Sequence, residues 1–218
     1  MNPNTQEMRQ MLVTMATMQE EHNQQVHPDW RTQGYDYYRA IWVECAELLD
    51  HYGWKWWKHQ TPDLEQSRLE LVDIWHFGLS ELIRDTIDLD EVLTGFDALA
   101  ARKQENKDTQ SIDSEGFRAA IESLAERTLV NKAFSMSAFV EALAALPMSY
   151  QELFELYIGK NVLNRFRQSH GYKEGTYQKL WAGREDNEHL IEVLAEVPVS
   201  TPAYVDALFS GLEARYSG

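Results

Sequence analysis

Two short stretches of the sequence each carry a pair of acidic side chains three residues apart. Glu44 and Glu47 form one pair, and Glu70 and Asp73 form the other. Residues three apart in an α-helix lie on the same face, about one turn from each other. Paired carboxylates at this spacing could bind a divalent cation or act as general acids and bases. We therefore take these four residues as the candidate chemical centre.

The surroundings of the acidic pairs suggest a metal. The helix expected over 63–85 is apolar almost all round, so Glu70 and Asp73 are expected to be buried. Buried ionised carboxylates are costly and repel one another, whereas Mg²⁺ takes oxygen ligands and keeps positions for substrate phosphates. A ferritin-like di-iron site needs Glu-x-x-His on two helices, and only Asp73 to His76 approximates that motif. The alternative is that Glu44 and Glu47 face solvent or pair with nearby lysine and arginine residues.

A basic segment over 160–184 stands out in a chain of net charge −15. This segment contains six lysine and arginine residues and a single acidic residue, Glu174. The cations are Lys160, Arg165, Arg167, Lys173, Lys179 and Arg184. Interspersed glycines let the backbone approach a ligand closely, and this composition favours a polyphosphate. The alternative is a solvated basic helix end that pairs with acids elsewhere in the chain.

Together, the acids and the basic segment favour phosphoryl-transfer chemistry. Carboxylates would hold Mg²⁺, the metal would bridge phosphate oxygens, and cations would neutralise the remaining charge. The sequence has no Gly-x-x-x-x-Gly-Lys-Ser/Thr loop, which argues against a P-loop enzyme. Cys45 lies inside an expected helix and has no nucleophile signature.

The overall composition excludes several classes of protein. The negative charge argues against a general binder of nucleic acid or anionic membranes. No apolar run approaches the roughly 20 residues needed to span a bilayer. The single cysteine fits a reducing compartment, and no signal-peptide pattern is present. We therefore expect a soluble cytoplasmic protein with no membrane partner.

The spacing of apolar residues predicts an all-α fold. Apolar residues recur at three- and four-residue spacing, and no stretch shows the alternation typical of strands. Asp63 and Ser149 are expected helix caps. A polar stretch over 103–114 is a possible connector, dividing the chain loosely into 1–105 and 112–218. Helices are expected near 5–25, 35–53, 63–85, 88–105, 114–128, 136–146, 149–169, 186–197 and 201–216.

Several longer motifs, in order, resemble the dimeric dUTPases. They span Arg39 to Asp50, Trp54 to Lys58, Glu70 to Phe77 and Gly159 to Gln168. The runs Gly171 to Lys173 and Arg184 to Asn187 follow. The resemblance covers about 8–83 and 157–190 and is weak over 86–150, for which only helical packing is expected.

The resemblance implies a fold and a cofactor. The fold would be a helical bundle of the all-α NTP pyrophosphatase type with a smaller helical lobe. We expect a single domain over 1–218, with metal-binding helices about 5–105 and a phosphate- and base-binding segment about 149–197. The protein would be a Mg²⁺-dependent homodimer that hydrolyses dUTP, and also dUDP, to dUMP.

The resemblance also assigns roles to individual side chains. Glu44, Glu47, Glu70 and Asp73 would be the metal ligands, and Glu47 would also deprotonate the attacking water. The phosphate-binding residues would be Lys160, Arg167, Tyr172 and Lys179. Asn164 would read the base through its amide.

Other polar and aromatic residues are candidates for substrate binding. Gln19 and Asn23 would lie near the nucleoside, although both could be ordinary helix-surface positions. Trp57 is the candidate for stacking on the base, and most of the neighbouring tryptophans are expected to pack. Lys58 is a further phosphate candidate, and Tyr172 could simply brace the glycine turn.

Two other functions remain open from the sequence. One is a house-cleaning pyrophosphatase for another nucleotide, such as dCTP or a damaged base. The other is a helical dimer that binds a nucleotide or a partner protein without hydrolysis. Assays of pyrophosphate release from each deoxynucleoside triphosphate would separate these functions.

Overall fold

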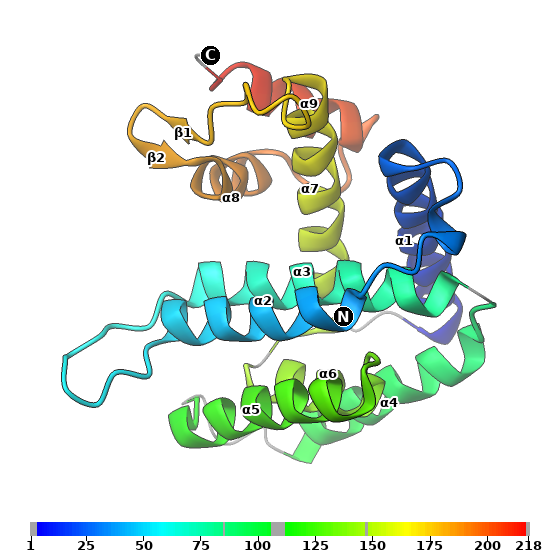
Figure 1. The fold of residues 1–218 in the computed structure, drawn as a ribbon, viewed down its shortest axis with the longest axis vertical. Coiled ribbons are helices and arrows are strands. Elements are labelled where there is room, and N and C mark those ends of the chain that lie inside the picture. The colour runs from blue at the N-terminus through cyan, green and yellow to red at the C-terminus, as the bar shows by residue number, and fades with distance from the viewer. Residues whose placement is uncertain (1–3, 85, 106–111, 147, 217–218) are drawn as a thin grey trace. The chain divides into compact units, whose positions relative to one another are not determined.

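The computed structural model describes residues 4–84, 86–105, 112–146 and 148–216 (Figure 1). For residues 98–105 it describes the backbone, and for the others also the side chains. Helices make up most of the described chain, and its only strands form one two-stranded hairpin, which confirms the all-α prediction. The first elements are α1 (Thr5–Val26), η1 (Trp30–Thr32), α2 (Tyr37–Tyr52), α3 (Leu64–Arg84) and α4 (Leu89–Glu105). The others are α5 (Ser114–Asn131), α6 (Met136–Ala145), α7 (Tyr150–Ser169), β1 (Leu180–Trp181), β2 (Arg184–Glu185), α8 (Asp186–Glu196) and α9 (Tyr204–Glu213).

Local contacts divide the chain into two compact units, Met1–Phe154 (unit 1) and Glu155–Gly218 (unit 2). The division expected around 103–114 is not where the units separate. Helix α5 packs on α2, and α6 packs on α4 and α5, so both belong to unit 1. Residues 106–111 of the expected connector lie outside the described residues.

The centre of unit 1 is the pair α2 and α3, which run side by side in opposite directions (Figure 1). Trp75 of α3 is fully buried and stacks on Phe139 at 5.3 Å between ring centroids. Phe96 of α4 meets the same indole edge-on at 5.5 Å. Gly78 lets the Phe134 ring pack against Trp75 and Phe139, because a Cβ atom at Gly78 would lie 2.6 Å from that ring. Aromatic contacts therefore fix α3 against α4 and α6.

Helix ends in unit 1 follow the capping rules. Asn4 accepts hydrogen bonds from the backbone of Gln6 and Glu7 and forms a capping box with Glu7. The expected cap Asp63 accepts from the Gln66 backbone at 3.1 Å. At the start of α7 the backbone N–H of Glu152 donates to Oγ of Ser149, and the backbone N–H of Ser149 donates to the Glu152 carboxylate. These caps satisfy backbone N–H groups that have no partner inside the helix.

Unit 2 contains the last turns of α7, a short hairpin, α8 and α9. The hairpin pairs Leu180 with Glu185 and Trp181 with Arg184, a ladder too short for alternation to predict. Its turn, Ala182-Gly183, has positive φ at both residues, as a type I′ turn requires. Phe166 of α7 is buried against the rings of Trp181 and Tyr216. This aromatic core positions the end of α7 beside the hairpin.

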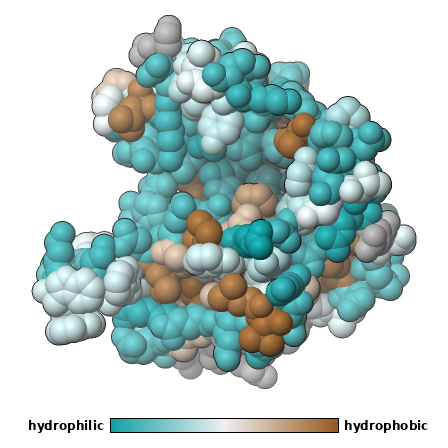
Figure 2. All heavy atoms as spheres, viewed as in Figure 1, coloured by the Kyte–Doolittle hydropathy of each residue, from teal (hydrophilic) through white to brown (hydrophobic). Residues whose placement is uncertain are grey.

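The face of the molecule in Figure 2 is polar. Figure 2 shows a face that is mostly hydrophilic, with apolar residues in small patches. Among the described residues, no helix combines the length and apolar character needed to cross a membrane.

Candidate active site

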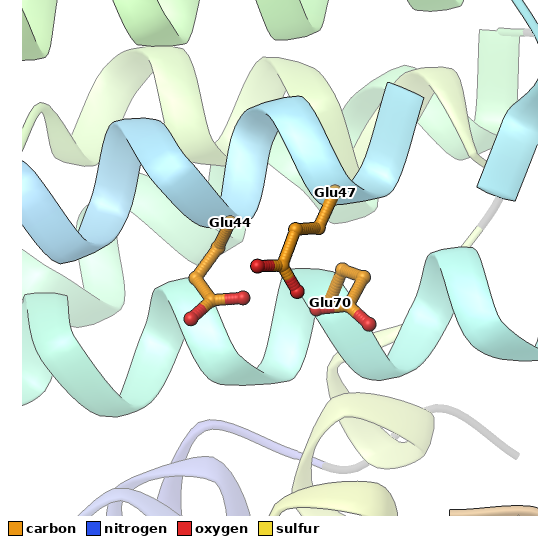
Figure 3. Close-up of side chains that lie close together, drawn as sticks. All are labelled: Glu44, Glu47 and Glu70. Atoms are coloured by element: carbon orange, nitrogen blue, oxygen red, sulfur yellow. The ribbon is translucent and has the colours of Figure 1, made fainter. Parts of the chain in front are cut away.

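Three of the four predicted metal ligands converge between α2 and α3. Glu44 and Glu47 extend from α2 toward α3, where Glu70 lies (Figure 3). One carboxylate oxygen from each lies within 4.8 Å of the others. Glu70 is buried, Glu44 is half-buried and Glu47 is exposed. The arrangement therefore has a closed side and a side that a ligand can reach.

The charge of Asp73 acts on the same group of carboxylates. Burial raises the pKa of Glu44 from 4.5 to about 9, and the negative charge of Asp73 is the next largest cause. A hydrogen bond with Glu70 and the charges of Glu70 and Glu47 add to the rise. We call these four residues the acid cluster. Their mutual repulsion means that the site favours positive charge, either a proton or a cation.

The chemistry of the acid cluster suits a hard divalent cation. All its donors are carboxylate oxygens, which Mg²⁺ prefers, whereas the thiol of nearby Cys45 is buried. Burial raises the pKa of Cys45 to about 12, so the thiol is neutral and a poor ligand or nucleophile. The residues present therefore fit Mg²⁺.

His51 lies beside the acid cluster, and the sequence interpretation missed it. Its Nε2 atom lies 3.6 Å from Oε1 of Glu70, and its side chain is 40% exposed. His51 follows Glu47 by four residues on α2, so the two share a helix face. That spacing was visible in the sequence. It carried no signal because a single histidine at a helix end is common.

The predicted phosphate residues of α7 are held by the start of α8. Arg167 forms two hydrogen bonds with the Asp186 carboxylate, both 2.8 Å long. Lys160 is buried and donates to Oδ1 of Asn187 at 3.1 Å. The hydroxyl of Tyr177 donates to Asp186 at 2.8 Å. One buried carboxylate thus joins α7, the chain before the hairpin, and α8.

Asp186 is ionised in this position. Burial would raise the pKa of Asp186, but hydrogen bonds from Arg167 and the Arg167 charge lower it below its ordinary value. Further along the basic segment, Lys179 pairs with Glu185 at 3.2 Å and Arg184 with Glu192 at 2.6 Å. The segment is therefore less positive than its own sequence suggests, because acids that follow it in the chain fold back onto it.

Two further predicted residues surround Arg167. Oδ1 of Asn164 accepts from Nη1 of Arg167 at 3.3 Å. The backbone N–H of Tyr172 donates to the Arg167 carbonyl, and the Tyr172 side chain is 53% exposed. Gly171 has φ +86, and a Cβ there would lie 2.1 Å from Thr176 Oγ1, so this turn requires glycine.

Gln19 and Asn23 are buried between α1 and α3. Their side chains are 3% and 6% exposed, so the alternative that they are surface positions is wrong. Both amides donate to the hydroxyl of Ser80 on α3. Ser80 is a residue that the sequence interpretation did not select.

The tryptophans after α2 lie in a loop and are exposed. Trp56 is 89% exposed, Trp57 57% and Trp54 47%, so the expectation that most of them pack is wrong. The Trp57 ring meets those of Trp54 and Trp56 edge-on at 5.2 and 5.4 Å. Lys58 is exposed on the same loop. The three indole rings of this loop contact one another and are not buried in the core.

The fold is all-α, and the acid cluster is a group of carboxylates that could hold a cation. Residues 11–172 match the family model described as dUTPase. The match covers more than half of the chain, and the chain belongs to the dimeric, all-α dUTPase family. The matched range includes the whole acid cluster and all of α7. A search of curated proteins gave no match.

Proposed function

We propose that the protein is a Mg²⁺-dependent dUTP diphosphatase that releases dUMP and pyrophosphate and also accepts dUDP. Membership of the dUTPase family supports hydrolysis of dUTP. The acid cluster carries the rest of the proposal. A group of carboxylates in which burial and like charge raise the Glu44 pKa to about 9 favours a divalent cation.

The acid cluster would hold Mg²⁺ through oxygens of Glu44, Glu47, Glu70 and Asp73. When bound, the metal would neutralise phosphate charge and favour ionisation of water. Glu47 is the ligand with the most solvent access, so it would also accept the proton of the attacking water. Glu70 is buried beside His51, which suits a fixed structural ligand.

The reaction balances without a covalent enzyme intermediate. A water oxygen bonds to the β-phosphorus, and the bond from that phosphorus to the oxygen shared with the α-phosphate breaks. The bridging oxygen leaves with dUMP, and the water proton passes to Glu47. Lys160, Arg167 and Lys179 would stabilise charge on the phosphate oxygens, and the Tyr172 hydroxyl would donate to one of them.

The nucleoside would be recognised by amides. Asn164 offers both a donor and an acceptor to the imide edge of uracil, and its contact with Arg167 holds it in place. Gln19 and Asn23 would contact the nucleoside from α1. The exposed ring of Trp57 is available to stack on the base, with Lys58 beside it as a phosphate contact.

We further propose that the protein acts as a homodimer in the cytoplasm. The resemblance to dimeric dUTPases supports the dimer. A single buried cysteine suits a reducing compartment.

Pyrophosphate release from dUTP with and without Mg²⁺ tests the proposal. We expect turnover with Mg²⁺ and none after chelation, and dUDP should yield inorganic phosphate under the same conditions. A panel that includes dCTP and dTTP identifies the preferred base. Metal-independent release, or no release from dUTP, would contradict the proposal.

A further inference from the structure

A polar cluster is buried between α1 and α3. Nε2 of Gln19 donates to Oδ1 of Asn23 at 3.1 Å and to Oγ of Ser80 at 2.9 Å. Nδ2 of Asn23 donates to the same Oγ at 3.1 Å. The three side chains are 3%, 6% and 1% exposed. Buried amides are costly unless they are hydrogen-bonded, so Ser80 stabilises both.

Ser80 determines which side of each amide is the donor. Its hydroxyl has two acceptors in reach, the backbone carbonyl of His76 at 2.9 Å and Oδ1 of Asn23 at 3.3 Å, and the shorter contact places the hydrogen on His76. A hydroxyl has a single hydrogen, so with that hydrogen on His76 the Ser80 oxygen can only accept. Both amides must then turn an N–H group toward Ser80. The Gln19 amide is fixed further by its second hydrogen, which is directed at Asn23.

The position of Ser80 on α3 relates this polar cluster to the acid cluster. Ser80 follows Asp73 by seven residues, which is two helical turns, so both lie on one face of α3. The separation along the helix axis is about 10 Å. That length is comparable with the span from the phosphates of a nucleotide to its base.

We propose that Ser80 is a positioning residue for base discrimination. By fixing the amides of Gln19 and Asn23, it presents the nucleoside with a defined order of donors and acceptors. Uracil and cytosine differ in that order, whereas an amide that can rotate by half a turn satisfies either base. This inference rests on the proposed function, in which the two amides contact the nucleoside.

Ser80→Ala tests the inference, with Ser67→Ala as its matched control. Ser67 is equally buried on α3, and its hydroxyl also donates to a carbonyl four residues back, that of Asp63 at 2.7 Å. For Ser80→Ala we expect kcat/KM for dUTP to fall by about tenfold through KM, which corresponds to about 1.4 kcal/mol and lies within the range for a lost hydrogen bond. The kcat/KM for dCTP should not fall, so the ratio of kcat/KM for dUTP to kcat/KM for dCTP should decrease. Ser67→Ala should keep the wild-type ratio.

Inhibition by pyrophosphate distinguishes positioning from general damage. Pyrophosphate lacks a nucleoside, so its inhibition constant should be the same for Ser80→Ala and the wild type. The inference would be overturned if Ser80→Ala lowered kcat/KM for dUTP, kcat/KM for dCTP and the affinity for pyrophosphate by the same factor. It would also be overturned if the ratio of kcat/KM for dUTP to that for dCTP did not change in Ser80→Ala. If the wild type binds dUMP without hydrolysing dUTP, the proposed function fails. The inference is then decided by calorimetry, in which the ratio of dUMP affinity to dCMP affinity should be smaller for Ser80→Ala than for the wild type. A wild type that binds neither overturns both.

Discussion

At the scale of single residues, the division of roles within the acid cluster follows from exposure. Glu70 is buried against α2 and cannot exchange protons with solvent freely, whereas Glu47 is exposed at the same group of oxygens. A general base must reach the attacking water and later lose its proton. Glu47 meets both requirements, and Glu44 and Glu70 are better placed to hold a cation.

Replacing Glu47 by Gln should therefore affect turnover more than folding. We expect kcat with dUTP to fall by on the order of 10²-fold or more. The amide keeps the shape of the side chain at an exposed position, so the melting temperature should change little. Asp50→Asn is the control, because Asp50 is exposed on the same helix and pairs with Lys55. Near-full activity in Glu47→Gln would remove Glu47 from the mechanism.

The Glu44 pKa predicts how pH and Mg²⁺ affect stability. Its folded value of about 9 lies above the ordinary 4.5, so the folded, metal-free protein holds a proton that the unfolded chain releases. The free energy of unfolding should therefore fall as pH rises from about 4.5 to 9. Mg²⁺ must displace that proton, so its stabilising effect should be larger at about pH 8 than at about pH 6.

Thermal unfolding with and without Mg²⁺ at both pH values measures this effect. Glu44→Gln has no proton to lose, so its metal-free stability should depend less on pH, and it should gain less from Mg²⁺. A Mg²⁺ effect that is equal at the two pH values would contradict the link between the metal and the acid cluster.

At the scale of elements, α7 and α8 are joined by one buried ion pair. Asp186 is fully buried at the start of α8, and the Arg167 side chain is 14% exposed. Removing one partner of such a pair leaves the other charge buried and uncompensated. The pair therefore positions the predicted phosphate-binding face of α7 before any nucleotide binds.

Asp186→Asn should destabilise the protein by about 3 kcal/mol in denaturant unfolding, because it leaves the Arg167 charge buried. The pKa of Asp186 is lowered in the folded state, so its contribution is present above the ordinary value of 3.8 and is lost as pH falls below it. The difference between wild type and Asp186→Asn should thus shrink in acid. Glu192→Gln, which breaks the exposed pair with Arg184, should have little effect.

At the scale of the whole molecule, the proposed chemistry needs both compact units. The acid cluster and the Gln19–Asn23–Ser80 cluster belong to unit 1, and the predicted phosphate residues Lys160, Arg167 and Lys179 belong to unit 2. Under the proposed function, a nucleotide with Mg²⁺ would bind residues of both groups. Its binding should therefore order the basic segment and exclude water from the reacting phosphate.

Limited proteolysis tests this coupling. Cleavage within the exposed stretch 172–180 should slow when Mg²⁺ and a non-hydrolysable dUTP analogue are added together. Mg²⁺ with deoxyuridine, which has no phosphates to contact the cations, should protect less. Equal cleavage rates in all conditions would show that the basic segment does not close over the substrate.

The sequence by itself determined the helices and the acid pairs. Helical periodicity and the three-residue spacing of Glu44 with Glu47 are local properties, and each can be read from a few neighbouring residues. The caps at Asp63 and Ser149 are local for the same reason. Matches to longer motifs then gave the family, and the family match confirmed it.

Only the tertiary structure decided which distant groups meet. The carboxylate of Asp186 on Arg167, the hydroxyl of Ser80 on two amides of α1, and His51 beside Glu70 all join residues from different elements. Burial also depends on packing, which is why Gln19 and Asn23 proved to be interior and the tryptophan loop exposed. Spacing along one helix determines which residues share a face of that helix. Which other helix contacts that face depends on how the helices pack.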